Sequence, residues 1–148
     1  MANNSLEVIE KESKQYIVVM VGSEQYGIDI TYIDNIVRMQ KITRIPKSQH
    51  YFNGVINLRG EIVPVMSIRR KMNLNEDVFT NSSRIIILKL EEKGSLGVIV
   101  DEVKEVVNLS DDEIENASNK GKFINGVGKH GDELVSLLEI NAIVEENV

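Results

Sequence analysis

A series of apolar segments and glycines occurs twice along this chain, in the same order, and this repeat limits the folds that the chain can adopt. Tyr26-Gly27-Ile28 is matched 70 positions later by Leu96-Gly97-Val98, and Gly54-Val55 is matched 72 positions later by Gly126-Val127. Apolar residues can coincide by chance, but the paired glycines make duplication the better explanation. The sequence therefore predicts two structurally similar halves.

Each half consists of short apolar runs that end at glycine or polar turns, which is the pattern of β-strands. Such runs cover residues 16–21, 26–30, 61–66, 84–90, 96–100 and 134–138. Helix signals are few: a capping box from Ser110 to Glu113, and short helical turns at 48–53, 67–72 and 141–145. Residues 30–37 fit either a helical turn or a bulged strand.

We therefore predict an all-β fold of two small β-barrels packed together, with a few short helices. The halves span about residues 15–80 and 81–148, after a disordered tail at residues 1–14, and strands could be exchanged between them. A barrel of roughly 70 residues has a thin core, so the two barrels are expected to share an apolar contact. A groove between such barrels is a natural docking site.

Composition excludes several classes of protein. With 148 residues, of which 42% are hydrophobic and 27% charged, the chain has the profile of one globular domain. It has no cysteine, which excludes disulfides and thiolate chemistry and fits a cytoplasmic protein. No apolar run approaches the ~20 residues of a membrane helix, and the start lacks signal-peptide features, so we expect no direct membrane insertion.

Charge is distributed unevenly along the chain. The net charge is −6, yet residues 38–84 hold nine basic and only three acidic side chains. A basic segment within an acidic protein can steer an acidic partner. Chance clustering of loop charges explains the same pattern equally well.

The patterns that would indicate a cofactor or an enzyme are incomplete. Residues 126–131 read G-x-G-x-x-G, but a strand-like run follows where a dinucleotide fold requires a helix, so a tight hairpin turn is the better interpretation. His50 and His130 lie in polar loops 80 positions apart, without a catalytic partner or zinc-ligand spacing. We therefore expect no catalytic, cofactor or metal site.

Three other functions have weak support. Nucleic-acid binding is disfavoured because the chain has four Tyr, three Phe and no Trp to stack on bases. The acidic run at 111–115 lacks the alternating ligands and glycine of a calcium loop and is better explained as a helix start. A small β-barrel hydrolase with paired carboxylates is an alternative, although no pair stands out.

The strongest functional signal lies between Phe52 and Val65. Arg59 is at a predicted turn between two apolar runs, beside Gly60. A guanidinium presents a planar fork of donors that suits a carboxylate or backbone carbonyls. Arg59 therefore either binds a partner or ties down its own loop, and the residues alone leave both readings open.

The segment Gly54-Val55-Ile56-Asn57-Leu58-Arg59-Gly60, followed by Ile62-Val63-Pro64-Val65, resembles the signature of the CheW family and of the related regulatory domain of the kinase CheA. The resemblance continues at residues 26–30, 43–46, 96–101 and 137–140 and covers nearly everything after residue 14. It implies two SH3-like five-stranded barrels. It also implies a cytoplasmic, non-catalytic scaffold, recruited to membrane receptor arrays, that couples chemoreceptors to a CheA-type histidine kinase.

The resemblance further implies where partners bind. Family members contact the CheA regulatory domain from barrel to barrel, and they hold the cytoplasmic tip of a chemoreceptor along the groove between the barrels. By position, Ile30, Ile33 and Ile36 are expected to line that groove with Val98 and Val100 nearby, and Arg59 to be the functional arginine. The receptor- or kinase-binding residues expected in all are Ile30, Ile33, Asn35, Ile36, Gly54, Asn57, Leu58, Arg59, Gly60, Val98 and Val100.

Two positions depart from the family pattern. Asn35 stands where many members carry glutamate, which puts an ion pair in doubt. Ser67 replaces the aspartate that is common after the Pro-Val strand, which bears on how the next helix is capped. The alternative function within the same class is a coupling or regulatory module of another two-component pathway.

Overall fold

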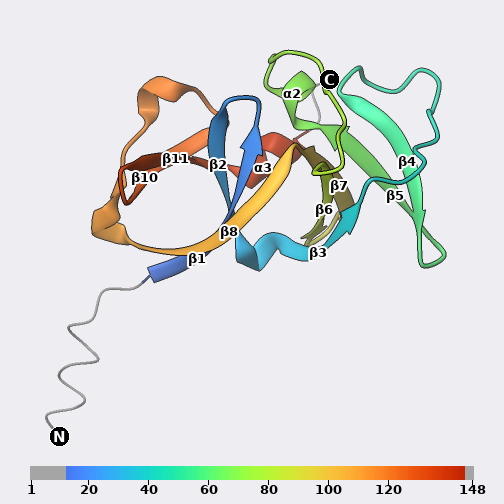
Figure 1. The fold of residues 1–148 in the computed structure, drawn as a ribbon. Helices are drawn as coiled ribbons and strands as arrows, with labels where there is room; N and C mark the ends of the chain where they lie inside the picture. The colour runs from blue at the N-terminus through green and yellow to red at the C-terminus, as the bar shows by residue number, and fades with distance from the viewer. Residues whose placement is uncertain (1–12, 146–148) are drawn as a thin grey trace, which may run out of the picture.

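The computed structural model describes residues 13–145. The chain forms two β-sheets, each curled into a small barrel, and the barrels lie side by side (Figure 1). We name them the first barrel, with strand order β8-β1-β2-β11-β10-β9, and the second barrel, with order β3-β6-β7-β5-β4. The predicted all-β fold of two SH3-like barrels is confirmed, and a two-residue sixth strand, β9, extends the first barrel.

The bounds of the elements follow the predicted apolar runs closely. The first barrel contains β1 (Ser13–Val21), β2 (Glu24–Asp29), β8 (Glu102–Ser110), β9 (Ile114–Glu115), β10 (Ile124–His130) and β11 (Glu133–Leu138). The second contains β3 (Ile33–Arg38), β4 (Phe52–Leu58), β5 (Glu61–Ser67), β6 (Arg84–Leu90) and β7 (Gly94–Val100). The helical segments are η1 (Ile30–Tyr32), α2 (Ile68–Lys71), η2 (Asp111–Glu113), η3 (Ser118–Lys120) and α3 (Ile140–Val144).

The two halves of the sequence exchange hairpins. The β1–β2 hairpin pairs with β8 and β11, whereas the β6–β7 hairpin pairs with β3 and β5. Both barrels have a parallel pair at the same place, β2 with β11 and β7 with β5, so the strand orders of the two sheets correspond. Each barrel is therefore assembled from both halves, and residue 80 does not separate the barrels.

This exchange explains why the central strands are apolar on both faces. All four residues from Ile85 to Leu88 in β6 are at most 1% exposed. Ile85 and Ile87 point into the second barrel, while Ile86 and Leu88 point into a core between the barrels. Burying each such side chain contributes roughly 1.5–3 kcal/mol, so β6 stabilises both cores. Continuous apolar runs are typical of strands buried on both faces.

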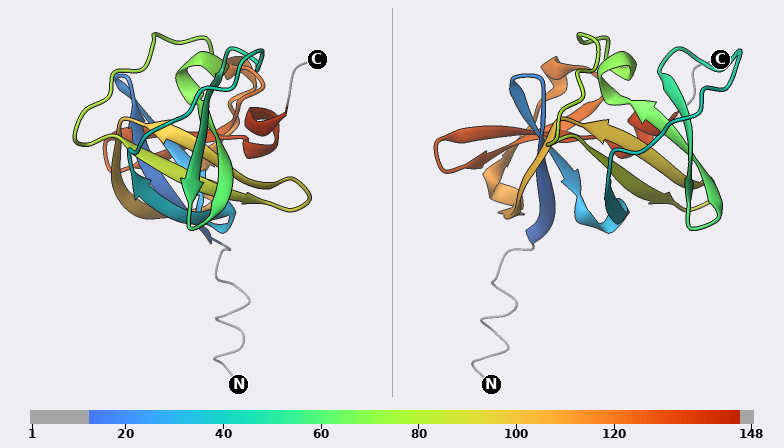
Figure 2. Two further views of the ribbon diagram at one scale, coloured as in Figure 1. Left: turned by 90° about the vertical axis from the view of Figure 1, so that its right-hand side faces the viewer. Right: turned by 45° about the vertical axis from the view of Figure 1, so that its right-hand side comes forward.

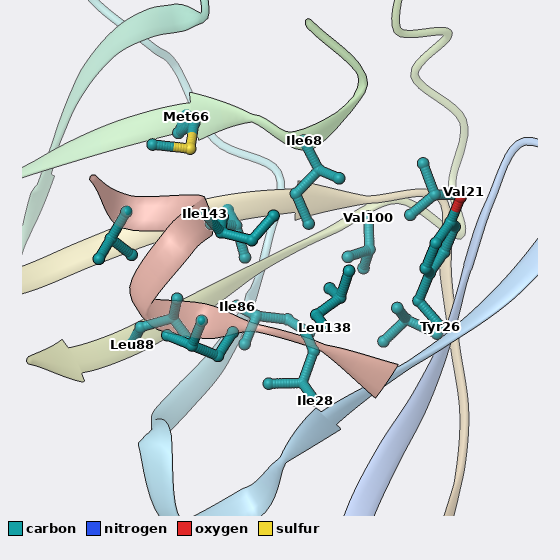
Figure 3. Close-up of a cluster of buried hydrophobic side chains, with 14 of the residues drawn as sticks. Val21, Tyr26, Ile28, Met66, Ile68, Ile86, Leu88, Val100, Leu138 and Ile143 are labelled. Carbon is teal, nitrogen blue, oxygen red and sulfur yellow. The ribbon is translucent and has the colours of Figure 1, made fainter. Parts of the chain in front are cut away.

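The shared core is the apolar contact that the thin barrels were expected to need. Val21, Tyr26 and Ile28 from the first barrel belong to one buried cluster with Met66 and Val100 from the second, and Figure 3 shows Val100 beside Val21 and Tyr26. Helix α3 inserts Ile143, which is fully buried, between them. The barrels consequently meet through a continuous core.

The local helix predictions had mixed outcomes. No helix forms at 48–53: Phe52 N donates to Gln49 O at 3.0 Å and closes a single turn, and Phe52 and Asn53 already belong to β4. The capping box at Ser110 exists, with its backbone N–H donating to Glu113 Oε1 at 2.8 Å, but it opens a single 3₁₀ turn. The predicted tail at 1–14 falls mostly outside the described residues, and Ser13 and Lys14 belong to β1.

The glycines of the G-x-G-x-x-G run serve two purposes. Gly131, with a φ of 64°, forms the predicted tight turn between β10 and β11. Gly126 and Gly128 instead lie inside β10, where added Cβ atoms would collide with the side chains of Ile114 and Leu109. The pattern therefore reflects a hairpin and close packing.

Candidate functional site

The isoleucines expected in the groove lie where β2 turns into β3. Asp29 caps η1, because its Oδ1 accepts hydrogen bonds from Thr31 N at 3.0 Å and Thr31 Oγ1 at 2.8 Å. The chain makes one 3₁₀ turn and then enters β3, whose pairing with β6 shifts register after Ile33. Both readings of residues 30–37, a helical turn and a bulged strand, are thus realised in succession.

The three isoleucines are half-buried. Ile30, Ile33 and Ile36 pack against the shared core on one side and keep part of their surface accessible on the other. Asn35, between them in the bulged strand, is also half-buried, and its Oδ1 accepts a hydrogen bond from Ile36 N at 2.8 Å. Its side chain is therefore engaged within its own strand.

The structure does not place Val98 and Val100 on the accessible surface with these isoleucines. They are 1% and 0% exposed and belong to the shared core. Their strand, β7, lies between β6 and β5 and is covered on both faces, so no surface of these side chains is free for a partner. Val98 and Val100 thus lie near the isoleucines, as expected, but behind them in the shared core, so they are not available for direct contact with a partner.

Arg59 and Gly60 form a two-residue turn that joins β4 to β5. Both have positive φ, 56° and 83°, which is the geometry of a type I′ hairpin turn. Asn57 Oδ1 accepts a hydrogen bond from Gly60 N at 3.0 Å and closes the turn. Leu58 is half-buried and packs inside the second barrel. Asn57 therefore holds this loop in place, which is the structural role that the sequence had left open for Arg59.

Arg59 itself is exposed and forms no hydrogen bond or ion pair within residues 13–145. The left-handed conformation favours glycine or asparagine and costs roughly 1–2 kcal/mol for most other residues. The arginine is thus in an unfavourable backbone conformation without a compensating contact in its own chain. Strained residues of this kind are frequent at functional sites.

Gly54 has a structural role. It is buried with a φ of 143°, and an added Cβ would collide with the carbonyl oxygen of Thr43. The close approach lets Thr43 and Val55 exchange two hydrogen bonds of 2.8 Å. Gly54 therefore joins the loop before β4 to the barrel, and its buried position removes it from direct contact with a partner.

The register of the second barrel brings Ile33 and Arg59 to one end. Ile33 at the start of β3 pairs with Leu88 near the end of β6, so the β6–β7 turn lies at this end too. Because β5 runs parallel to β7, the Arg59–Gly60 turn that precedes β5 falls there as well. A hollow of about 700 Å³ lies at this end, between η1, the β6–β7 turn and α3.

Two apolar residues near the hairpin tips were missed by the sequence reasoning. Ile62, two residues after Gly60, is 60% exposed, and Leu134 at the equivalent place in β11 is 61% exposed. The signal was present, because Val63 and Val65 point inward and alternation along a strand then turns Ile62 outward. The repeat spacing relates Leu134 to Ile62 in the same way.

A polar link joins the two barrels. Asp101 lies between β7 and β8, and its Oδ2 accepts a hydrogen bond from Gly22 N in the first barrel at 2.8 Å. The same oxygen forms an ion pair with Arg69 Nη2, from α2, and Arg69 Nη1 donates to the backbone oxygen of Glu76 at 2.9 Å. This buried arginine thereby ties the second barrel to a turn of the first.

Asp77 is a half-buried carboxylate beside the N-terminus of α2. Its Oδ2 accepts a 2.5 Å hydrogen bond from Ser67 Oγ, which also caps α2 by accepting from Arg70 N at 3.1 Å. Burial raises the pKa of Asp77 above 3.8, although Ser67 and Arg69 act in the opposite direction. Asp77 lines none of the main hollows within residues 13–145, so it gives no support to the hydrolase alternative. The hydroxyl of Ser67 therefore caps α2.

The basic segment divides into paired and free cations. Arg69, Arg70, Lys71 and Arg84 contact acceptors within the fold. The others are exposed and form no ion pair in the described part of the chain: Arg38, Lys41, Arg44, Lys47 and Arg59. The free cations are therefore concentrated in the loop between β3 and β4.

Other kinds of site find no support in residues 13–145. There, no group of three or more potential metal-binding side chains is gathered closely enough to hold an ion. No helix in that range has the length and apolar character needed to cross a membrane. His50 and His130 are both exposed, and His130 Nε2 lies 3.7 Å from Glu105 Oε2.

Comparison with known proteins bears on this architecture. The family model of the CheW-like domain matches residues 15–148. Chemotaxis protein CheW of Bacillus subtilis is 34% identical over 141 residues, covering 92% of this chain and 90% of that protein. Chemotaxis protein CheW of Thermotoga maritima is 30% identical over 129 residues, covering 85% and 84%. The crystal structure of the scaffolding protein TtCheW from Thermoanaerobacter tengcongensis has a TM-score of 0.84 at 29% identity, covering 92% of this chain and 95% of that one. The domain match, the identity across nearly the whole length and the shared fold agree with the signature around Arg59: this chain belongs to the CheW family.

Proposed function

We propose that this protein couples chemoreceptors, the methyl-accepting chemotaxis proteins, to a CheA-type histidine kinase and carries out no reaction of its own. As a CheW-family member it is a chemotaxis scaffold. The observation that carries the proposal is Arg59, an exposed cation held in a strained turn without a partner in the described chain. Such a residue is best explained by contact with another molecule.

The receptor-facing surface lies at the end of the second barrel that holds both Ile33 and Arg59. The accessible parts of Ile30, Ile33 and Ile36 suit the apolar stripe of an amphipathic receptor helix. Arg59 suits a carboxylate or the backbone carbonyls of that helix, because its guanidinium donates in a planar fork. Ile62 lies next to Arg59 on the same hairpin and adds apolar area there.

The kinase-facing surface lies on the first barrel, around Leu134. Leu134 and Ile62 have nearly equal exposure at equivalent hairpin positions, so each is a candidate anchor for a partner. Since Ile62 is beside Arg59, Leu134 is the one left for a second partner. A kinase regulatory domain built from similar barrels can meet it by barrel-to-barrel contact. The scaffold would then act in the cytoplasm, at receptor arrays.

Reconstitution tests the proposal. The protein is mixed with a CheA-type kinase and with a chemoreceptor cytoplasmic fragment, separately and together, and each mixture is analysed by sedimentation. We expect binary binding to each partner and retention of the kinase by the receptor fragment that increases when the protein is added. Binding to the kinase together with failure to bind any receptor fragment would instead favour the regulatory module of another pathway. Absence of both binary complexes would contradict the proposal.

A further inference from the structure

The loop between β3 and β4 forms a pocket that the receptor and kinase surfaces do not use. It arches over the start of β4 and encloses a hollow of about 250 Å³, which we name the loop pocket. Its charged lining residues are Arg44, Lys47, Arg70 and Glu76, and its polar ones are Ser48, Gln49, His50 and Asn53. In the right-hand view of Figure 2 the loop runs over the upper side of the second barrel, while the β4–β5 turn lies at its lower edge. The seven residues of β4 separate them by roughly 20 Å.

The pocket has a net positive charge and one cation fixed in place. Arg70 Nε donates to Glu76 Oε1 at 3.0 Å, and Arg70 Nη1 donates to the backbone oxygen of His50 at 3.0 Å. These two bonds orient the guanidinium and compensate the charge of Glu76, while Arg70 Nη2 has no partner among the described residues. Arg44 and Lys47 add two exposed, unpaired cations. An anionic group would gain charge-assisted hydrogen bonds here.

The pocket also presents an acceptor and an apolar rim. Asn53 Oδ1 is buried and accepts no hydrogen bond from the described residues. Ile45, 46% exposed, and the half-buried Phe52 contribute apolar side chains to its lining, which we call its apolar rim. A bare inorganic anion would meet the cations and leave the apolar rim uncovered. An acidic peptide supplies a carboxylate for the cations, a backbone N–H for Asn53 and side-chain carbon for the rim.

We propose that the loop pocket binds a glutamate or aspartate side chain carried by an acidic segment of a protein partner. Arg70 is the preoriented donor, and Arg44 and Lys47 close around the carboxylate. The site is at the other end of the barrel from Arg59. Its ligand therefore binds independently of the receptor surface, and the inference does not depend on the coupling function.

The test uses the full-length ¹⁵N-labelled protein and an acetylated, amidated hexaglutamate peptide, at low ionic strength. We expect saturable NMR shifts confined to the amides of Lys47, His50 and Asn53. Lys47→Asn removes a charge, and asparagine readily adopts the local φ of 65°. It should weaken binding roughly fivefold, the effect of one exposed charge-assisted contact of about 1 kcal/mol. Arg44→Gln should act similarly.

The matched control is Lys41→Gln, which makes the same change of net charge in the same loop but does not line the pocket. It should change the affinity less than twofold. Equal loss in Lys41→Gln and Lys47→Asn, or shifts spread over all exposed cations, would show nonspecific attraction and overturn the proposal. Inorganic phosphate is titrated in parallel, and shifts of the same amides at the same concentration would show a small-anion site instead of a peptide site.

Discussion

Replacing Arg59 by asparagine should stabilise the fold and weaken receptor binding at the same time. The turn between β4 and β5 has positive φ at both of its residues, and Asn-Gly is the sequence that such a type I′ turn prefers. The native Arg-Gly turn therefore sacrifices stability to keep a guanidinium at the tip. The variant removes the guanidinium and restores the favoured turn.

The two effects have predictable sizes. A residue other than glycine, asparagine or aspartate costs roughly 1–2 kcal/mol in the left-handed region, so the gain in free energy of unfolding should be up to about 1 kcal/mol. For a domain of this length that corresponds to a rise in Tm of roughly 2–4 °C. Loss of one charge-assisted contact should cost about 1.5–3 kcal/mol of binding energy, tenfold or more in Kd.

Thermal unfolding and titration with a receptor cytoplasmic fragment measure both effects, with Arg59→Ala as the control. Alanine also removes the guanidinium but keeps a Cβ in the unfavourable conformation, so it should weaken binding equally without the gain in Tm. A drop in Tm of both variants would mean that the arginine holds the fold together. Unchanged receptor binding in both would remove Arg59 from the proposed interface.

Three further predictions concern the fold and its charges. Gly54→Ala should lower the free energy of unfolding, measured by urea titration, by at least ~2 kcal/mol, because the alanine would be strained and its Cβ would collide with Thr43. Gly94→Ala is the control: its φ is 81° but the space around it is open, so the free energy of unfolding should fall by only about 1 kcal/mol. Equal losses in the two variants would show that the structure relieves the collision at Gly54. Burial raises the pKa of Asp77 in the folded protein, so ionising its carboxyl lowers the free energy of unfolding. This loss is absent at low pH and appears as the pH rises through the pKa of Asp77. Asp77→Asn should therefore be more stable than the wild type near neutral pH, and the advantage should vanish at low pH; an advantage that grows on acidification would contradict this. Raising the salt concentration should slow association with an acidic partner more than it speeds dissociation, because exposed charges more than about 8 Å apart are screened at physiological ionic strength. Association rates that do not change with salt concentration would refute steering by the free cations.

Much of the fold could be predicted because its signals are local. Apolar runs, turn glycines and the capping serine at 67 each act within a few residues, and the repeat predicted two similar units. The sequence left the exchange of strands between the halves open, because β6 is apolar on both faces and that pattern is compatible with either partner strand. The Arg69–Asp101 ion pair joins residues 32 positions apart and leaves no periodic signal.

The candidate site was predicted unevenly for the same reason. The turn at Arg59 was visible because Gly60 follows it, but its unfavourable φ required coordinates. Val98 and Val100 were assigned to binding by the family resemblance, and the apolar pattern of their strand does not reveal that both of its faces are covered. Asn57 was assigned to binding, although its hydrogen bond to Gly60 N gives it a role within the turn.

The central claim is that the protein holds two partners on separate surfaces, and a pair of matched variants tests it most directly. Ile33→Asp places a charge in the apolar receptor surface, and Leu134→Asp does the same on the first barrel. Binding of each variant to the receptor fragment and to the kinase is measured separately, and circular dichroism verifies folding. If Ile33→Asp unfolds, Ile33→Ala takes its place.

The account predicts that Ile33→Asp loses the receptor fragment and keeps the kinase, and that Leu134→Asp does the reverse. Either variant alone should abolish the ternary complex, because one bound partner raises the effective concentration of the other only while both surfaces bind. Folded variants that always lose both partners together would show that the partners share one surface, which would contradict the two-surface scaffold.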